Sequence, residues 1–149
     1  MTTFGREIRL STASLTNSSS SGALVDVEKL NLRKYASRTG LAMVLTDYLL
    51  YVEHNTRKAL ELCAEATKEN EFRSWWWKAR LGKCYFKLGL LREAEQQLRS
   101  SLKIQPVINT YLDLCNVYLR LDVPNTALDL LTEAADKFTC EPRLVLGLV

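Results

Sequence analysis

The sequence predicts an all-α protein, a solenoid of stacked antiparallel helix pairs that follows an extended N-terminal leader. Two stretches match each other at an interval of 33 residues, and apolar residues in each recur at three- and four-residue steps, which marks one face of a helix. Gly89 and Pro106, residue types that end helices, separate the apolar segments. Each helix pair is therefore expected to bury its apolar face against the next pair.

Six matched positions keep one order in both stretches: large, small, aromatic, small, large and small. The first copy holds Leu81, Gly82, Tyr85, Ala94, Leu98 and Ser101, and the second holds Leu114, Cys115, Tyr118, Ala127, Leu131 and Ala134. This order and period are typical of the tetratricopeptide repeat. The small residues are expected where two helices cross, since close approach of helices requires small side chains. We therefore predict that these twelve residues form the repeat packing, with an ordinary helical bundle as the alternative.

Residues 1–38 are predicted to be a Ser-rich, largely extended leader. The run Ser18–Gly22 is flexible and polar, and a short helical pattern begins only near residues 25–35. No apolar signal segment follows Met1.

Residues 39–74 are predicted to form a degenerate helix-pair repeat. Its second helix matches the next repeat at an interval of 35 residues, and His54-Asn55 replaces the glycine of the turn. The expected inward face of its first helix is Leu41, Val44, Leu45, Tyr48 and Leu49, and that of its second helix is Ala59, Cys63 and Ala66.

Residues 75–107 form the better-defined predicted repeat. Its first helix is expected from about Trp75 to Leu88, and Gly89 ends it because glycine adopts a positive φ freely. The second helix is expected from about Arg92 to Ile104.

Residues 108–141 form the second predicted repeat, and residues 142–149 are predicted to start a further, truncated one. Leu144, Gly147 and Leu148 fit the opening of another first helix. Because this terminal segment is apolar and lacks a polar capping helix, we expect a fragment of a longer array or a short isoform of it.

Composition and charge give no sign of catalysis, cofactor binding or nucleic-acid binding. Residues 1–38 carry six Lys/Arg against three Asp/Glu, whereas residues 39–149 carry fourteen of each. No basic stripe, phosphate-binding glycine loop, zinc-ligand spacing or span of about 20 apolar residues is present. His54, the single histidine, falls in a predicted turn. We therefore expect no enzyme activity, no cofactor or metal, no nucleic-acid partner and no direct membrane insertion.

The cysteines are expected to be reduced, with Cys63, Cys84 and Cys115 on buried helical faces.

The first helices of such repeats line a groove, and repeat register predicts which residues face it. These positions hold Trp76, Ala79, Lys83, Phe86 and Lys87 in one repeat and Asn109, Leu112, Asn116, Leu119 and Arg120 in the next. Aromatic groups supply contact area, amides hydrogen-bond a peptide backbone, and the basic residues favour an acidic guest. The candidate partner groove is therefore Trp76, Lys83, Phe86, Lys87, Asn116 and Arg120.

The triplet Trp75-Trp76-Trp77 cannot point in one direction, because successive helical residues lie about 100° apart. We expect one or two of these tryptophans to pack against the preceding repeat and Trp76 to face the groove.

Several motifs resemble a tetratricopeptide-repeat subunit of the BBSome, the complex of Bardet–Biedl syndrome proteins. The matching segments span nearly the whole chain and are Arg9–Ser14, Leu30–Tyr35, Trp75–Lys78, Gly82–Tyr85, Arg92–Glu95, Thr126–Leu128 and Asp136–Phe138. The tryptophan triplet and the leader motifs are specific, since the general repeat pattern requires neither.

This resemblance implies a non-enzymatic scaffold subunit that acts in protein trafficking to and from cilia. Its expected partners are other BBSome subunits: a second repeat subunit, β-propeller subunits and a small extended subunit. Its expected locations are the cilium, the basal body or centrosomal region, and the cytoplasm. A generic repeat adaptor in another assembly is the alternative, although Ala79 and Lys83 depart from the lysine–asparagine pattern of chaperone-binding members. A third possibility is a regulatory domain attached to a catalytic part beyond this chain.

Overall fold

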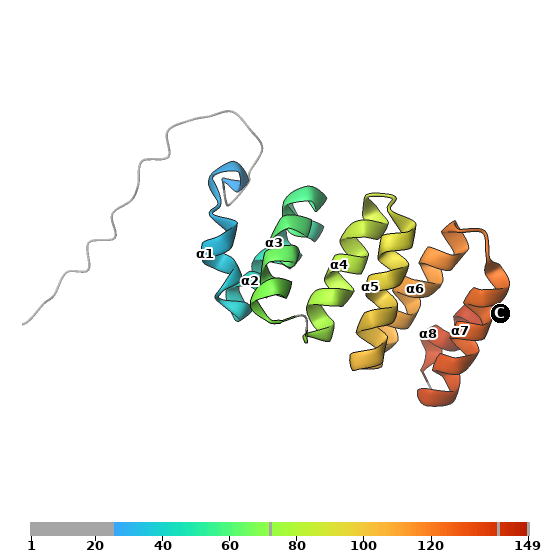
Figure 1. Cartoon of the computed structure of the whole chain (residues 1–149). Coiled ribbons are helices and arrows are strands. Elements are labelled where there is room, and N and C mark those ends of the chain that lie inside the picture. Colours follow the sequence, from blue (N-terminus) through green and yellow to red (C-terminus); the bar gives the residue numbers. More distant parts are fainter. Residues whose placement is uncertain (1–25, 72, 140, 149) are drawn as a thin grey trace, which may run out of the picture.

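The computed structural model describes residues 26–71, 73–139 and 141–148, and within them eight α-helices stand side by side in a row (Figure 1). A short 3-10 turn, Val27–Lys29, precedes them. The helices are α1 (Leu32–Ala36), α2 (Thr39–Tyr51), α3 (Thr56–Glu69), α4 (Trp75–Lys87), α5 (Leu91–Ile104), α6 (Ile108–Arg120), α7 (Pro124–Lys137) and α8 (Pro142–Leu148).

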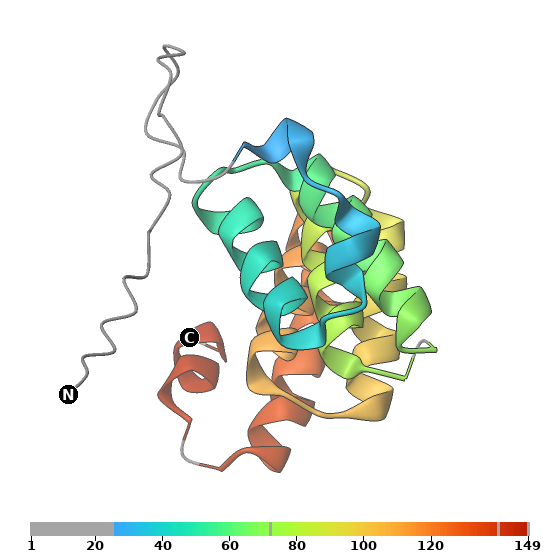
Figure 2. The same ribbon diagram turned by 90° about the vertical axis from the view of Figure 1, so that its left-hand side faces the viewer.

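The helices form two layers. The helices α2, α4 and α6 pack against α3, α5 and α7 respectively, and each of these three partners packs in turn against the next helix of the first layer. Figure 2 looks along the row, with α2 and α8 on one side and α3 on the other. We call the outer surface of α2, α4, α6 and α8 the first-helix face, and that of α3, α5 and α7 the second-helix face.

The central repeat confirms the predicted boundaries to within one residue. The helix predicted from Trp75 to Leu88 is α4, which ends at Lys87, and the helix predicted from Arg92 to Ile104 is α5, which begins at Leu91. The two helices α6 and α7 lie within the predicted repeat 108–141, and α8 lies within 142–149.

Each of the turns that follow α2, α4 and α6 contains one residue with a positive φ. His54 (φ 53°), Gly89 (φ 80°) and Asp122 (φ 59°) each adopt the left-handed region. After Gly89, the N–H of Leu90 donates to the carbonyl of Tyr85 over 2.9 Å and closes the end of α4. The turn at His54 is one residue longer, because its closing hydrogen bond runs from the N–H of Asn55 to the carbonyl of Leu49, six residues back instead of five.

The shared positive φ makes a testable prediction about the turns. Gly89→Ala should lower the free energy of unfolding by about 1–2 kcal/mol, because a Cβ penalises the left-handed conformation. His54→Gly should leave it unchanged or raise it by up to about 1 kcal/mol, since relief of that penalty opposes the extra entropy of the unfolded chain. Urea denaturation followed by circular dichroism measures both variants. An unaffected Gly89→Ala would mean that this turn has another conformation in solution.

The predicted inward face of α2 is wrong for two of its five residues. Leu41 and Val44 are 45% and 69% exposed. The buried residues of α2 are Ala42, Thr46, Leu49 and Leu50. Because α2 carries apolar side chains on nearly every side, periodicity did not select its buried face. The contact with α3 selects the side with the small residues Ala42 and Thr46, where the helices can approach closely.

The end of the predicted leader is helical and packed. Helix α1 contacts α2 and α3, and Ala36 is buried there. This helix lies where the sequence shows its short helical pattern, so the predicted leader is helical at Val27–Lys29 and Leu32–Ala36. The Ser-rich run and the rest of residues 1–25 lie outside the described residues.

The core consists of two apolar clusters that meet between α4 and α5. One is built from α1 to α4 around the fully buried Trp77, and the other from α5 to α8 around Leu114. Tyr85 contacts both clusters, and Gly82 faces Leu98 across the α4–α5 contact. The close crossing of α4 and α5 therefore joins the two halves of the core.

Candidate protein-binding site

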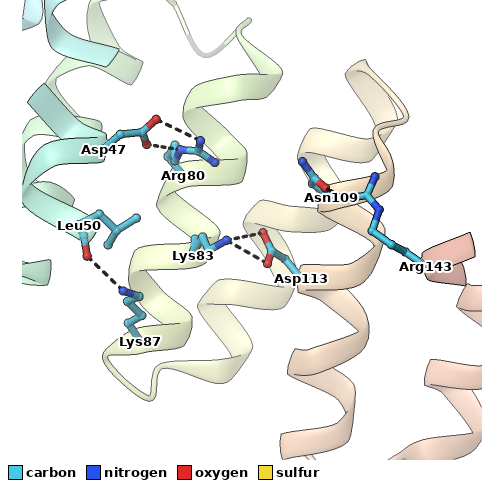
Figure 3. Close-up of polar contacts among 8 residues, drawn as sticks. All are labelled: Asp47, Leu50, Arg80, Lys83, Lys87, Asn109, Asp113 and Arg143. Atoms are coloured by element: carbon cyan, nitrogen blue, oxygen red, sulfur yellow. Dashed lines mark hydrogen bonds and ion pairs between the residues drawn. The ribbon is translucent and has the colours of Figure 1, made fainter. Parts of the chain in front are cut away.

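Side-chain contacts connect the neighbouring helices of the first-helix face (Figure 3). Asp47 of α2 accepts two hydrogen bonds from the guanidinium of Arg80 on α4, at 2.7 and 3.3 Å. At the far end, the guanidinium of Arg143 on α8 donates to the amide oxygen of Asn109 on α6 over 2.7 Å. These contacts fix the spacing of the helices that carry the predicted groove residues.

Lys83 of α4 forms an ion pair with Asp113 of α6, with 3.3 Å between Nζ and Oδ1. Burial alone would lower the pKa of this half-buried ammonium, but the Asp113 carboxylate and the Tyr51 hydroxyl outweigh it and raise the pKa. Lys83 is therefore charged and already neutralised by Asp113. Lys83 lies on the predicted face, but its ammonium already pairs with a carboxylate of the same chain and has less charge to offer a partner.

Three cationic side chains lie near the ring of Tyr51. The charged groups of Arg80, Lys83 and Lys87 lie 6.0, 5.5 and 5.3 Å from its centroid. Lys87 also donates to the main-chain carbonyl of Leu50 over 3.1 Å (Figure 3). Because Tyr51 is 42% exposed, this cluster offers an aromatic surface surrounded by positive charge.

A second aromatic–cation pair lies farther along the face. The guanidinium of Arg120 lies 5.1 Å from the centroid of Phe86. Asn116 and Leu119 on α6 are exposed, and Leu119 exposes 54% of its surface. Phe86 and Arg120, predicted independently as groove residues, are thus direct neighbours.

The tryptophan triplet divides between the core and the surface. Trp77 is fully buried, and Trp76 packs edge-on against it with 4.6 Å between ring centroids. The outer part of Trp76 contacts the guanidinium of Arg80 at 4.7 Å from its centroid. Ala79, expected in the groove, is only 5% exposed and belongs to the helix contact instead.

Sequence reasoning missed four residues that organise this face: Asp47, Tyr51, Arg80 and Asp113. One signal was present, because Arg80 and Asp113 occupy the same repeat position with opposite charges, 33 residues apart. Residues at one repeat position lie on neighbouring first helices, so this alternation of charge predicts attraction between the helices.

The residues predicted to form the repeat packing lie in the core or at its edge. Leu81, Gly82, Ala94, Leu98, Ser101, Leu114, Cys115, Tyr118, Ala127, Leu131 and Ala134 are buried, and Tyr85 is half-buried. Ser101 also donates its hydroxyl to the main-chain carbonyl of Trp75 over 2.8 Å, which ties α5 to the start of α4. Among the cysteines, Cys63, Cys84 and Cys115 are free and buried as expected.

The thiols of Cys63 on α3 and Cys84 on α4 lie next to each other where the two helices pack. A hydrogen bond with Cys84, together with burial, raises the pKa of the Cys63 thiol well above its ordinary value. Both side chains are fully buried, so they fill the core as small apolar groups.

The described residues contain no group of three His, Cys, Asp or Glu side chains arranged to hold a metal ion. None of the helices placed by the structure has the length and apolar character that crossing a bilayer requires.

Two solved structures share the fold. A thermophilic TPR protein of Thermus thermophilus superposes with a TM-score of 0.68 at 24% identity, covering 82% of this chain and 69% of its own. A point mutant of MamA superposes with a TM-score of 0.60 at 19% identity, covering 70% and 79% respectively. No protein-family model matches the sequence.

The chain has the tetratricopeptide-repeat fold. Its relatives include proteins named tetratricopeptide repeat protein 8 from Mus musculus (42% identity), Homo sapiens (36%) and Caenorhabditis elegans (33%). The alignments cover 96–97% of this tetratricopeptide-repeat protein. The same alignments span only 28–31% of the relatives' own length.

Proposed function

We propose that this tetratricopeptide-repeat protein is a non-enzymatic scaffold subunit of the BBSome that acts in protein trafficking to and from cilia. Its partners are other BBSome subunits: a second repeat subunit, β-propeller subunits and a small extended subunit. The proposed locations are the cilium, the basal body or centrosomal region, and the cytoplasm.

One observation supports this proposal above the others. Homology to tetratricopeptide repeat protein 8 extends over 97% of the chain at up to 42% identity. The aligned region therefore spans the tryptophan triplet, which here joins the core to the first-helix face.

The first-helix face supplies the contacts for a partner segment. Exposed Lys87 and Arg120 each lie against an aromatic ring, those of Tyr51 and Phe86 respectively. The combination of cation and ring binds acidic and apolar side chains together. Lys83 contributes less, since Asp113 already neutralises it.

Tagged purification from ciliated cells, read by mass spectrometry, tests the function. We expect the wild-type chain to recover BBSome subunits and Lys87→Glu/Arg120→Glu to recover at least about fivefold less, because charge reversal at a contact opposes binding. Arg33→Glu/Arg57→Glu, which changes the net charge equally at two exposed positions on α1 and α3, is the matched control and should behave as wild type.

The outcomes test the ciliary role and the two contact residues separately. Recovery of a different assembly by the wild-type chain would contradict the ciliary role and leave a generic repeat adaptor. Equal recovery of BBSome subunits by all three forms would retain the ciliary role and exclude Lys87 and Arg120 as contacts. Circular dichroism of the purified variants verifies that they are folded.

A further inference from the structure

A large cavity lies on the second-helix face, away from the predicted groove. Its volume is about 710 Å³, and it opens between α3 and α5, which both pack on α4. Its lining from α4 includes Lys78, Leu81 and Tyr85, each two residues from Arg80, Lys83 and Lys87 of the first-helix face. Two residues correspond to a rotation of about 200° around a helix, so the two sets lie on opposite sides of α4.

The lining combines apolar side chains with a local excess of positive charge. Ala64, Leu81 and Tyr85 supply apolar surface, and the volume is typical of a ligand-binding cavity. Five cationic residues line it against the single carboxylate of Glu95, although residues 39–149 as a whole carry equal numbers of each charge. The five are Lys68, Lys78, Arg92, Arg99 and Lys103.

The carboxylate of Glu95 is already occupied. It forms ion pairs with Arg92 at 3.4 Å and Arg99 at 3.2 Å, and it accepts a hydrogen bond from the Tyr118 hydroxyl. Lys68 has its own partner outside the cavity lining, Glu65, at 3.1 Å. Glu65 therefore neutralises the charge of Lys68, and Glu95 neutralises part of the charge of Arg92 and Arg99.

The two remaining lysines keep their charge available. Half-buried Lys78 donates to the neutral hydroxyl of Ser100 over 2.7 Å. Within the described residues, Lys103 makes no hydrogen bond or ion pair. An ammonium that lacks a counter-charge gains from a carboxylate placed beside it, and the gain is larger at Lys78, which is partly removed from water, than at the exposed Lys103.

A second cavity continues the first along the row of helices. It has a volume of about 520 Å³ and shares Arg99 and Lys103 with the first. Leu102 and Leu130 supply most of its apolar surface, with the buried Leu114 beneath them, and Asp129 and Glu133 also line it. The two cavities lie side by side along the second-helix face and together reach from α3 to α7, which suits an extended chain better than a compact small molecule. We call the pair of cavities the second-helix groove.

We propose that this second-helix groove binds an extended acidic peptide segment of a partner protein. Its carboxylates lie beside Lys78 and Lys103, and its apolar side chains enter the cavity lined by Leu102, Leu114 and Leu130. The groove is a binding surface separate from the first-helix face, so the chain can hold two partner segments at once. This proposal does not depend on the BBSome assignment.

Fluorescence anisotropy with a short fluorescein-labelled peptide of glutamate and leucine tests the groove on the full chain. Lys78→Glu/Lys103→Glu should weaken binding at least about tenfold, because two favourable contacts become repulsive. The matched control is Arg33→Glu/Arg57→Glu at two exposed positions on α1 and α3, which changes the net charge equally and should alter binding by less than about twofold. Lys87→Glu/Arg120→Glu is measured beside them, because the first-helix face could bind the same peptide.

Three outcomes would overturn the proposal. Equal losses in Lys78→Glu/Lys103→Glu and in the control Arg33→Glu/Arg57→Glu would mean non-specific attraction by charge. A loss confined to Lys87→Glu/Arg120→Glu would place the acidic guest on the first-helix face. Tighter binding of a labelled oligothymidylate that depends on Lys78 and Lys103 would assign the groove to nucleic acid.

The single variant Lys103→Glu tests the groove with a substitution that should not disturb the fold. Lys103 is exposed and without a partner among the described residues, so its reversal leaves every described contact intact. We expect peptide binding to weaken at least about threefold with an unchanged circular dichroism melting curve. Unchanged binding in this variant would also overturn the proposal.

Discussion

Gly82→Leu is expected to lower the free energy of unfolding by about 3 kcal/mol or more, near the upper end of overpacking effects. A Cβ atom at Gly82 would lie 2.6 Å from Cγ and 2.8 Å from Cδ2 of Leu98. Leu98 is fully buried, so its side chain cannot move into solvent to make room. The substitution therefore forces α4 and α5 apart where the two halves of the core meet. Thermal and urea denaturation followed by circular dichroism measure the loss.

Two further variants decide whether this contact is responsible. Gly40→Ala is the matched control, because Gly40 also lies in a helix but has open space around its Cβ position. It should be neutral or stabilising by up to about 1 kcal/mol, as the helix propensity of alanine predicts. Combining Gly82→Ala with Leu98→Ala should cost less than the sum of the two single changes, since the shortened side chain vacates the space that the new Cβ needs. Strict additivity would place the crossing elsewhere.

Trp77→Ala is expected to cost about 3–5 kcal/mol, a large part of the stability of a typical domain. Trp77 is the largest fully buried side chain of the described residues, and it packs within the cluster built from α1 to α4. Its removal leaves a cavity that these helices fill only partly. Urea denaturation followed by circular dichroism measures the cost without depending on tryptophan fluorescence.

The neighbouring variants separate packing from polarity. The indole Nε1 of Trp77 has no hydrogen-bond partner among the described residues, so Trp77→Phe breaks no hydrogen bond. It should cost clearly less than Trp77→Ala, because the phenyl ring fills much of the same space. Trp76→Ala should also cost less, since Trp76 is only half-buried. If Trp76→Ala proved the more destabilising variant, the division of the triplet described above would be wrong.

The candidate site was predictable to the extent that it follows from repeat register. Register placed Lys87, Phe86 and Arg120 on one face, and the structure adds that Phe86 and Arg120 contact each other directly. Repeat register did not predict that Asp113 neutralises Lys83, because that ion pair joins two helices of different repeats. The binding roles of these residues stay predictions.

The sequence by itself determined the helix pairs, their boundaries in the central repeat and the small residues at their crossing. These features depend on local periodicity, on Gly89 at a left-handed turn and on the absence of a side chain at Gly82. Only the tertiary structure decided which side of α2 is buried and where the cations of the second-helix groove come together. Both depend on how one helix is placed against another. Apolar residues on nearly every side of α2 permit several packings, and Lys78 and Lys103 line the same cavity only because α5 lies beside α4.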